Sequence, residues 1–105
     1  MKVTVVVTEN FRIAAKPLLK KFPSLKNDLL LLEQQLTGNP KLGTSLGHDA
    51  YKIRLRIGSK GKGKSGGARV ITLVETTIIV SRNEEANTVN LLTIYDKSDT
   101  ATITD

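Results

Sequence analysis

The sequence contains no cysteine and no tryptophan, and it has a single histidine beside two phenylalanines and two tyrosines. Without cysteine the chain can form no disulfide, and it offers no thiolate to catalysis or to a metal. One histidine and scattered acidic residues give no metal-ligand spacing, so we expect neither a metal nor another cofactor. The sequence lacks an apolar run of membrane-spanning length, and its first seven residues are too short for a signal peptide. We therefore expect a soluble, cytoplasmic protein that does not associate with a membrane.

The pattern of apolar residues predicts a single α+β domain over 1–105. We expect strands over 2–7, about 50–58, 68–81 and 88–96, helices over about 9–22 and 25–37, a loop over 38–49 and a polar turn over 83–87. The order β-α-α-β-β-β has its late strands close together in sequence. This order predicts two N-terminal helices packed on a small curved, mainly antiparallel sheet.

Proline and hydroxyl residues suggest how the two helices begin and end. Thr8 and Ser24 are candidate N-caps, because each precedes an amphipathic segment and carries a side-chain oxygen. Pro17 lies inside the first segment, so we expect either a kink there or two short helices.

The positive charge is concentrated in one part of the sequence. The net charge is +6, and the window 52–69 contains no acid and seven basic residues: Lys52, Arg54, Arg56, Lys60, Lys62, Lys64 and Arg69. The rest of the chain is close to neutral, with nine basic and ten acidic residues. A single concentrated patch of this kind predicts binding to phosphate groups of a polyanion.

Residues 58–65, Gly-Ser-Lys-Gly-Lys-Gly-Lys-Ser, match the nucleotide-binding P-loop pattern. A P-loop requires a following helix, whose N-terminal amides hold the phosphates. Here two more glycines and a β-branched run follow, which favours a strand. We interpret the segment as a long, flexible hairpin loop between antiparallel strands, and we expect no nucleotide cofactor.

The segment 51–57 alternates apolar and basic residues with the period of a strand. Tyr51, Ile53, Leu55 and Ile57 are expected to face the core, and Lys52, Arg54 and Arg56 to line the opposite face. Arg69, on the next strand of the hairpin, can join this row and help to bind phosphate. His48 precedes the strand and is a weaker candidate for a base.

Several segments, in the same order, resemble the RelE/HigB branch of the RelE/ParE toxin superfamily: Lys20–Lys26, Asn39–Gly43, Tyr51–Leu55, Lys60–Ile71 and Leu91–Ser98. The resemblance covers nearly the whole chain. It implies the small α/β fold of that family and the toxin role in a bacterial type II toxin-antitoxin system. It also implies a metal-independent endoribonuclease that cleaves mRNA, commonly on the ribosome, with a cognate antitoxin protein as partner.

The resemblance also assigns the site. It implies catalytic roles for Lys52, Arg54, Arg69 and Lys97, and RNA binding by Arg56, Lys60, Lys62 and Lys64. Family members usually continue into a C-terminal helix, which in some carries a catalytic tyrosine, and here the sequence ends where that helix would begin. Two alternatives therefore stay open: a toxin-fold protein without nuclease activity that binds RNA or sequesters an antitoxin, and a ParE-like inhibitor of DNA gyrase.

Overall fold

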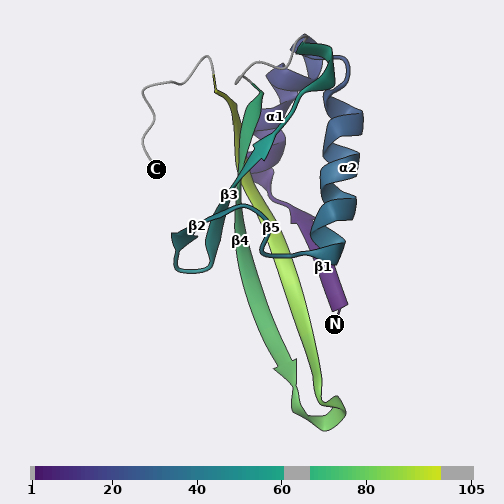
Figure 1. Ribbon diagram of the computed structural model, residues 1–105, viewed down its shortest axis with the longest axis vertical. Coiled ribbons are helices and arrows are strands. Elements are labelled where there is room, and N and C mark those ends of the chain that lie inside the picture. The colour runs from purple at the N-terminus through teal and green to yellow at the C-terminus, as the bar shows by residue number, and fades with distance from the viewer. Residues whose placement is uncertain (1, 61–66, 98–105) are drawn as a thin grey trace.

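The computed structural model describes residues 2–60 and 67–97, in which two helices pack on a five-stranded mixed sheet (Figure 1). The elements in chain order are β1 Lys2–Val7, α1 Glu9–Lys21, α2 Leu25–Gly38, β2 Thr44–Gly47, β3 Ala50–Leu55, β4 Ala68–Ile79 and β5 Glu84–Asp96. Short 3₁₀ turns, η1 at Gly58–Lys60 and η2 at Val80–Arg82, follow β3 and β4. The α+β class and the two N-terminal helices are as the sequence predicts.

The strands are ordered β1-β5-β4-β3-β2 across the sheet. The pair β1 and β5 is parallel, and the other three pairs are antiparallel, so the sheet is mainly antiparallel as expected. The expected element order lacked β2, because the sequence analysis placed these residues in a loop. His48 and Asp49 both have positive φ, 52° and 64°, and they form the tight turn that brings Gly47 beside Ala50.

Three strand boundaries also differ from the prediction. β3 ends at Leu55 instead of about residue 58, and β4 ends at Ile79 instead of residue 81. β5 begins at Glu84, although 83–87 was expected to be a turn. The chain reverses instead through η2 and Asn83, whose φ of 52° is left-handed. The polar residues at the start of β5 pair with the end of β4 in a ribbon that is exposed to solvent. Because strands of such a ribbon can be polar, the polar composition of 83–87 did not distinguish a strand from a turn.

One of the two expected N-caps is confirmed. The hydroxyl of Thr8 accepts a hydrogen bond from the Phe11 N–H at 3.2 Å. Ser24 has right-handed helical dihedrals rather than the extended ones of a capping residue, and its side chain does not cap α2. α1 continues through the exposed Pro17 as one helix, so the alternative of two short helices is wrong. In the described parts of the chain, neither helix has the length and apolar character needed to cross a membrane.

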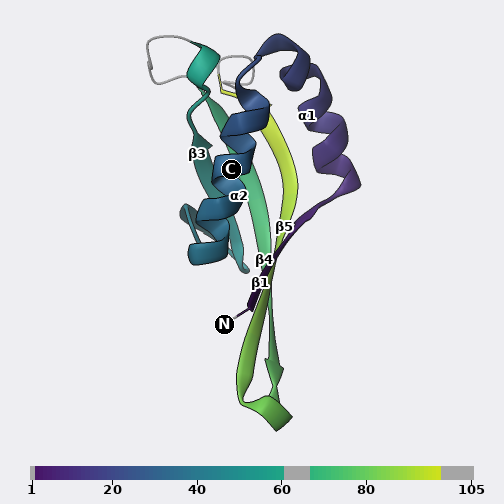
Figure 2. The same cartoon turned by 90° about the vertical axis from the view of Figure 1, so that its right-hand side faces the viewer.

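Both helices lie on one face of the sheet, and they cover the apolar core (Figures 1 and 2). The core includes Phe11, Leu18, Leu25, Leu32, Leu36, Ile53, Val70, Val89 and Ile94, all buried. In the described residues no helix lies on the opposite face, which we call the open face. Side chains that alternate with the core residues of β3, β4 and β5 therefore point toward the open face.

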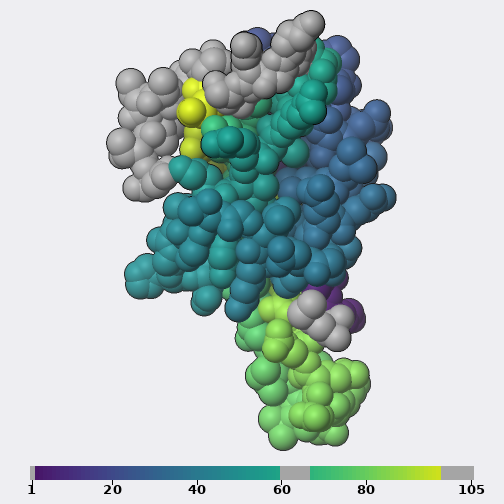
Figure 3. Space-filling model, viewed as in Figure 1, coloured from purple at the N-terminus to yellow at the C-terminus, as the bar shows by residue number. Residues whose placement is uncertain are grey.

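β4 and β5 project beyond the rest of the molecule as a two-stranded ribbon (Figures 1 and 3). β3 pairs with β4 only as far as Leu73, and β1 pairs with β5 only from Ala86 onward, in the register of the described strands. Residues 75–85 therefore form a hairpin that extends past both neighbouring strands, and we call it the arm. With the arm the molecule is 48 Å long, against 27 and 24 Å in the other directions.

Candidate nucleic-acid interface

The basic and apolar residues of β3 separate onto the two faces of the sheet as predicted. Ile53 and Leu55 are buried on the helix side, whereas Arg54 is exposed and Lys52 is half-buried on the open face. Arg56 is also exposed, but it lies just after the end of β3 instead of within the strand.

Arg69 lies on β4 directly opposite Arg54. The register of β4 and β5 then places Tyr95 directly opposite Arg69 on its other side. Arg69 is only 6% exposed, and its guanidinium donates a hydrogen bond from Nη1 to the carbonyl of Ala68 at 3.2 Å. Arg54, Arg69 and Tyr95 thus form a row across three adjacent strands, and the prediction that Arg69 joins the basic row is confirmed.

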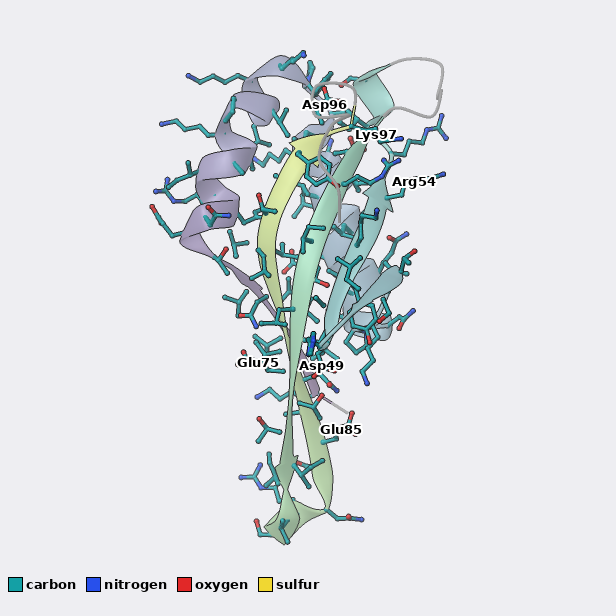
Figure 4. The ribbon with its side chains drawn as sticks, turned by 90° about the vertical axis from the view of Figure 1, so that its left-hand side faces the viewer. Asp49, Arg54, Glu75, Glu85, Asp96 and Lys97 are labelled. Carbon is teal, nitrogen blue, oxygen red and sulfur yellow. The ribbon has the colours of Figure 1, made fainter. Side chains whose placement is uncertain are left out.

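Lys52 and Lys97 lie on either side of this row. Lys52 is in register with Ile71, which is in register with Thr93, so Lys52 belongs to the next row of the open face. Lys97 follows β5 and is exposed, and its backbone N–H donates to the Gly67 carbonyl at 3.1 Å. Figure 4 shows Arg54 and Lys97 at the same end of the sheet, away from the arm. The four predicted catalytic residues therefore come from β3, β4 and the end of β5.

Gly67, directly before β4, lies close against the end of β3. Its φ is +78°, and a Cβ at this position would lie 2.6 Å from the carbonyl oxygen of Leu55. A side chain here would therefore require both a strained backbone and a shift of β3. This close contact keeps Arg69 in register with Arg54, two residues further along β4.

A hydrogen-bonded cluster fixes the start of the glycine-rich segment 58–67, which we call the basic loop, to α2. The hydroxyl of Ser24 accepts from the Ser59 N–H at 2.7 Å, and it donates to Oδ2 of Asp28 at 2.8 Å. The same carboxylate oxygen accepts from the Gly58 N–H at 3.1 Å. Lys60 ends η1 directly after this cluster, so its backbone is held near α2. Lys62 and Lys64 lie outside the described residues.

Sequence reasoning missed Tyr95, because a β-bulge changes the face on which it lies. Ile71 is paired with Thr93, but Thr72 is paired with Leu91, so Leu92 is an extra residue in β5. Simple alternation from the buried Leu91 would put Tyr95 in the core. The extra residue reverses this assignment, and Tyr95 faces the same side as Arg69.

His48, a weaker candidate from the sequence, and Asp96, at the end of β5, both lie away from the row. His48 is exposed in the β2–β3 turn, at the opposite end of β3 from Arg54. Asp96, which follows an apolar strand as a magnesium-binding acid does, is buried on the helix side, with one carboxylate oxygen 3.9 Å from Lys21 Nζ. Across residues 2–60 and 67–97, no group of three histidine, cysteine or acidic side chains could hold a metal. The segment after the glycine-rich loop is β4, where a P-loop would need a helix.

The row contains residue types that bind phosphodiesters in proteins. Two guanidinium groups on directly opposed residues can donate to the two free oxygens of a phosphate, and the phenol beside Arg69 can donate or accept a further hydrogen bond. Strand backbones fix these groups at their Cα atoms, as a preorganised anion site requires. No protein-family model matches the sequence.

Proposed function

We propose that this protein is the toxin of a bacterial type II toxin-antitoxin system, with the fold of the RelE/ParE superfamily. Its activity is metal-independent endonucleolytic cleavage of mRNA, carried out on the ribosome. The observation that carries the proposal is the cross-strand pair of Arg54 and Arg69, with Lys52 and Lys97 from neighbouring rows of the same open face.

The chemistry needs no metal, because RNA supplies its own nucleophile. The 2′-oxygen attacks the adjacent phosphorus while the bond to the 5′-oxygen breaks, leaving a 2′,3′-cyclic phosphate and a 5′-hydroxyl. Lys52 accepts the 2′-hydroxyl proton or orients that hydroxyl, and Arg54 and Arg69 bind the phosphorane oxygens. Lys97 protonates the leaving oxygen or binds a flanking phosphate.

The position of the site suits an extended, single-stranded RNA. Lys52 and Arg54 on β3 are followed by Arg56, just after the strand. A strand of RNA lying along this direction would place one phosphate at the Arg54–Arg69 pair and others near Lys52 and Arg56. An acidic antitoxin segment over the same face would neutralise the toxin, with an affinity that falls as salt rises.

Single-turnover cleavage of ribosome-bound mRNA tests the proposal. Arg54→Ala and Arg69→Ala should lower the cleavage rate by about 10²- to 10³-fold while RNA affinity changes little, as expected for lost transition-state contacts. Lys52→Ala should act similarly. If Lys52 must lose a proton, Lys52→Arg should fail to restore the rate, because arginine stays charged.

Loop and control variants separate catalysis from general electrostatic attraction. Lys62→Ala and Lys64→Ala should weaken RNA binding modestly and each lower the salt slope by about one. Arg82→Ala removes a cation from the tip of the arm and should change neither rate nor affinity. Equally small losses of cleavage rate and RNA affinity at the strand and loop positions would show that these residues only attract RNA electrostatically. RNA binding without cleavage by the unmodified chain would favour the protein without nuclease activity.

A further inference from the structure

An apolar groove lies on the helix side of the molecule, between α1, α2 and β1. It has a volume of about 260 Å³ and is lined by Val5, Val7, Phe11, Leu19, Lys26, Leu29, Leu30, Glu33 and Leu91. Several of these apolar side chains are exposed, among them Val7 at 56% and Leu30 at 50%. The two charged lining residues, Lys26 and Glu33, both come from α2 and carry opposite charges.

The tip of the arm also carries exposed apolar side chains and one charge of each sign, so it can complement the groove. Val80 is 84% exposed and Ile78 is 61% exposed, so the arm ends in two branched apolar side chains in contact with solvent. Arg82 and Glu84, which are 3.8 Å apart, place one positive and one negative charge beside them. An exposed apolar tip flanked by both charges is typical of a surface that binds another protein.

We propose that the groove receives the arm tip of a second copy of this chain. Val80 and Ile78 would fill the apolar groove, Arg82 would meet Glu33, and Glu84 would meet Lys26. Each side of the contact then removes exposed apolar surface from water. Arg82 and Glu84 exchange their contact with each other for contacts with Glu33 and Lys26 of the second copy.

The arrangement of the two surfaces favours a partner molecule over the chain's own arm. The arm points away from the body, so its tip lies far from α1 and α2 (Figure 2), whose side chains line most of the groove. Two copies related by a two-fold axis can exchange arms, and this exchange closes the assembly at a dimer with two identical contacts. Residues of the basic row belong to neither surface, so the dimer does not depend on the ribonuclease activity proposed above.

Sedimentation equilibrium of the purified chain, without an antitoxin, tests the dimer. The unmodified protein should show a concentration-dependent dimer, and Val80→Asp should raise its dissociation constant by at least about tenfold. Ile13→Asp is the matched control, because Ile13 is 57% exposed on α1 and does not line the groove. Circular dichroism of each variant checks that it is folded. A chain that stays monomeric at millimolar concentration, or equal effects of the two aspartates, would overturn the proposal.

A charge exchange tests which residues meet. Glu33→Arg should weaken the dimer, because it places a cation opposite Arg82. Adding Arg82→Glu to the same chain should restore the dimer. If the double variant is no better than Glu33→Arg alone, the arm does not lie in the groove. Binding of another protein in the groove with no self-association would show that a different partner occupies it.

Discussion

Removing the carboxylate of Asp28 should destabilise the whole fold through a short connection between α2 and the basic loop. One oxygen of this side chain accepts hydrogen bonds from the Ser24 hydroxyl and from the Gly58 N–H. Asp28→Ala removes both bonds and leaves two donors to find water. It also removes a negative charge from the first turn of α2, where the helix dipole favours an anion.

The size of the effect follows from these contacts. Asp28 is half-buried and Gly58 is exposed, so solvent weakens both bonds. We take about 0.5–1 kcal/mol for each of the two partly exposed bonds and about 0.3–0.5 kcal/mol for the dipole, which gives about 1.3–2.5 kcal/mol. For a domain of this size, the melting temperature should fall by about 5–20 °C.

Urea denaturation followed by circular dichroism measures the loss. Asp28→Asn keeps an acceptor oxygen and should lose less, and Gln34→Ala, exposed on the same helix, should change stability by less than about 0.5 kcal/mol. Ser24→Ala breaks the same cluster, so the double variant should lose less than the sum of the two single losses. Asp28→Ala with wild-type stability, or strictly additive losses, would refute the connection.

Two further changes test the helices. Leu32→Ala should lower the free energy of unfolding, measured by urea denaturation, by about 2–5 kcal/mol, because Leu32 is 1% exposed. Leu31 is 59% exposed, so Leu31→Ala should lower it by less than about 0.5 kcal/mol. Similar losses for the two variants would contradict the packing of α2. The Arg12 guanidinium donates a hydrogen bond to Glu9 and lowers the pKa of that carboxyl. The pair therefore stabilises the fold at a pH above the usual glutamate pKa of about 4.3. This contribution is lost as the pH falls through the lower pKa of the folded state. Glu9→Gln should therefore be slightly less stable than the wild type at pH 7 and equal to it in acid, and a difference that persists in acid would exclude the pair as its cause.

The period-two pattern of residues 51–57 was sufficient to predict the basic face of β3. Each buried residue there is flanked by a basic one, and the strand has no irregularity between Ala50 and Leu55. The hairpin with β4 was predictable from the glycine-rich loop and the β-branched run after it. Once that hairpin was assigned, Arg69 could be expected near Arg54. Local pattern and chain connectivity were enough for these two residues.

Tyr95 and β2 could not be predicted in the same way, because each depends on pairing between strands. The side on which Tyr95 lies is decided by the extra residue at Leu92, whose carbonyl also accepts from the Asn10 side chain at 2.9 Å. The bulge therefore contacts the start of α1, which is far away in sequence. β2 is a four-residue strand with all its residues exposed, so it carries no apolar alternation to predict it. Its pairing depends on the backbone dihedrals of His48 and Asp49.

The position of β5 determines when the protein can fold during synthesis. Among the described strands β5 is made last, yet it lies between β1, which is made first, and β4. The β3–β4 hairpin can form early because its pairing is local, whereas β1 must wait for the final strand before it can form its parallel ladder. A growing chain that ends before Tyr95 therefore exposes its apolar residues and has not assembled the cationic row. The nascent polypeptide therefore acquires its site only after β5 has been synthesised, together with its core.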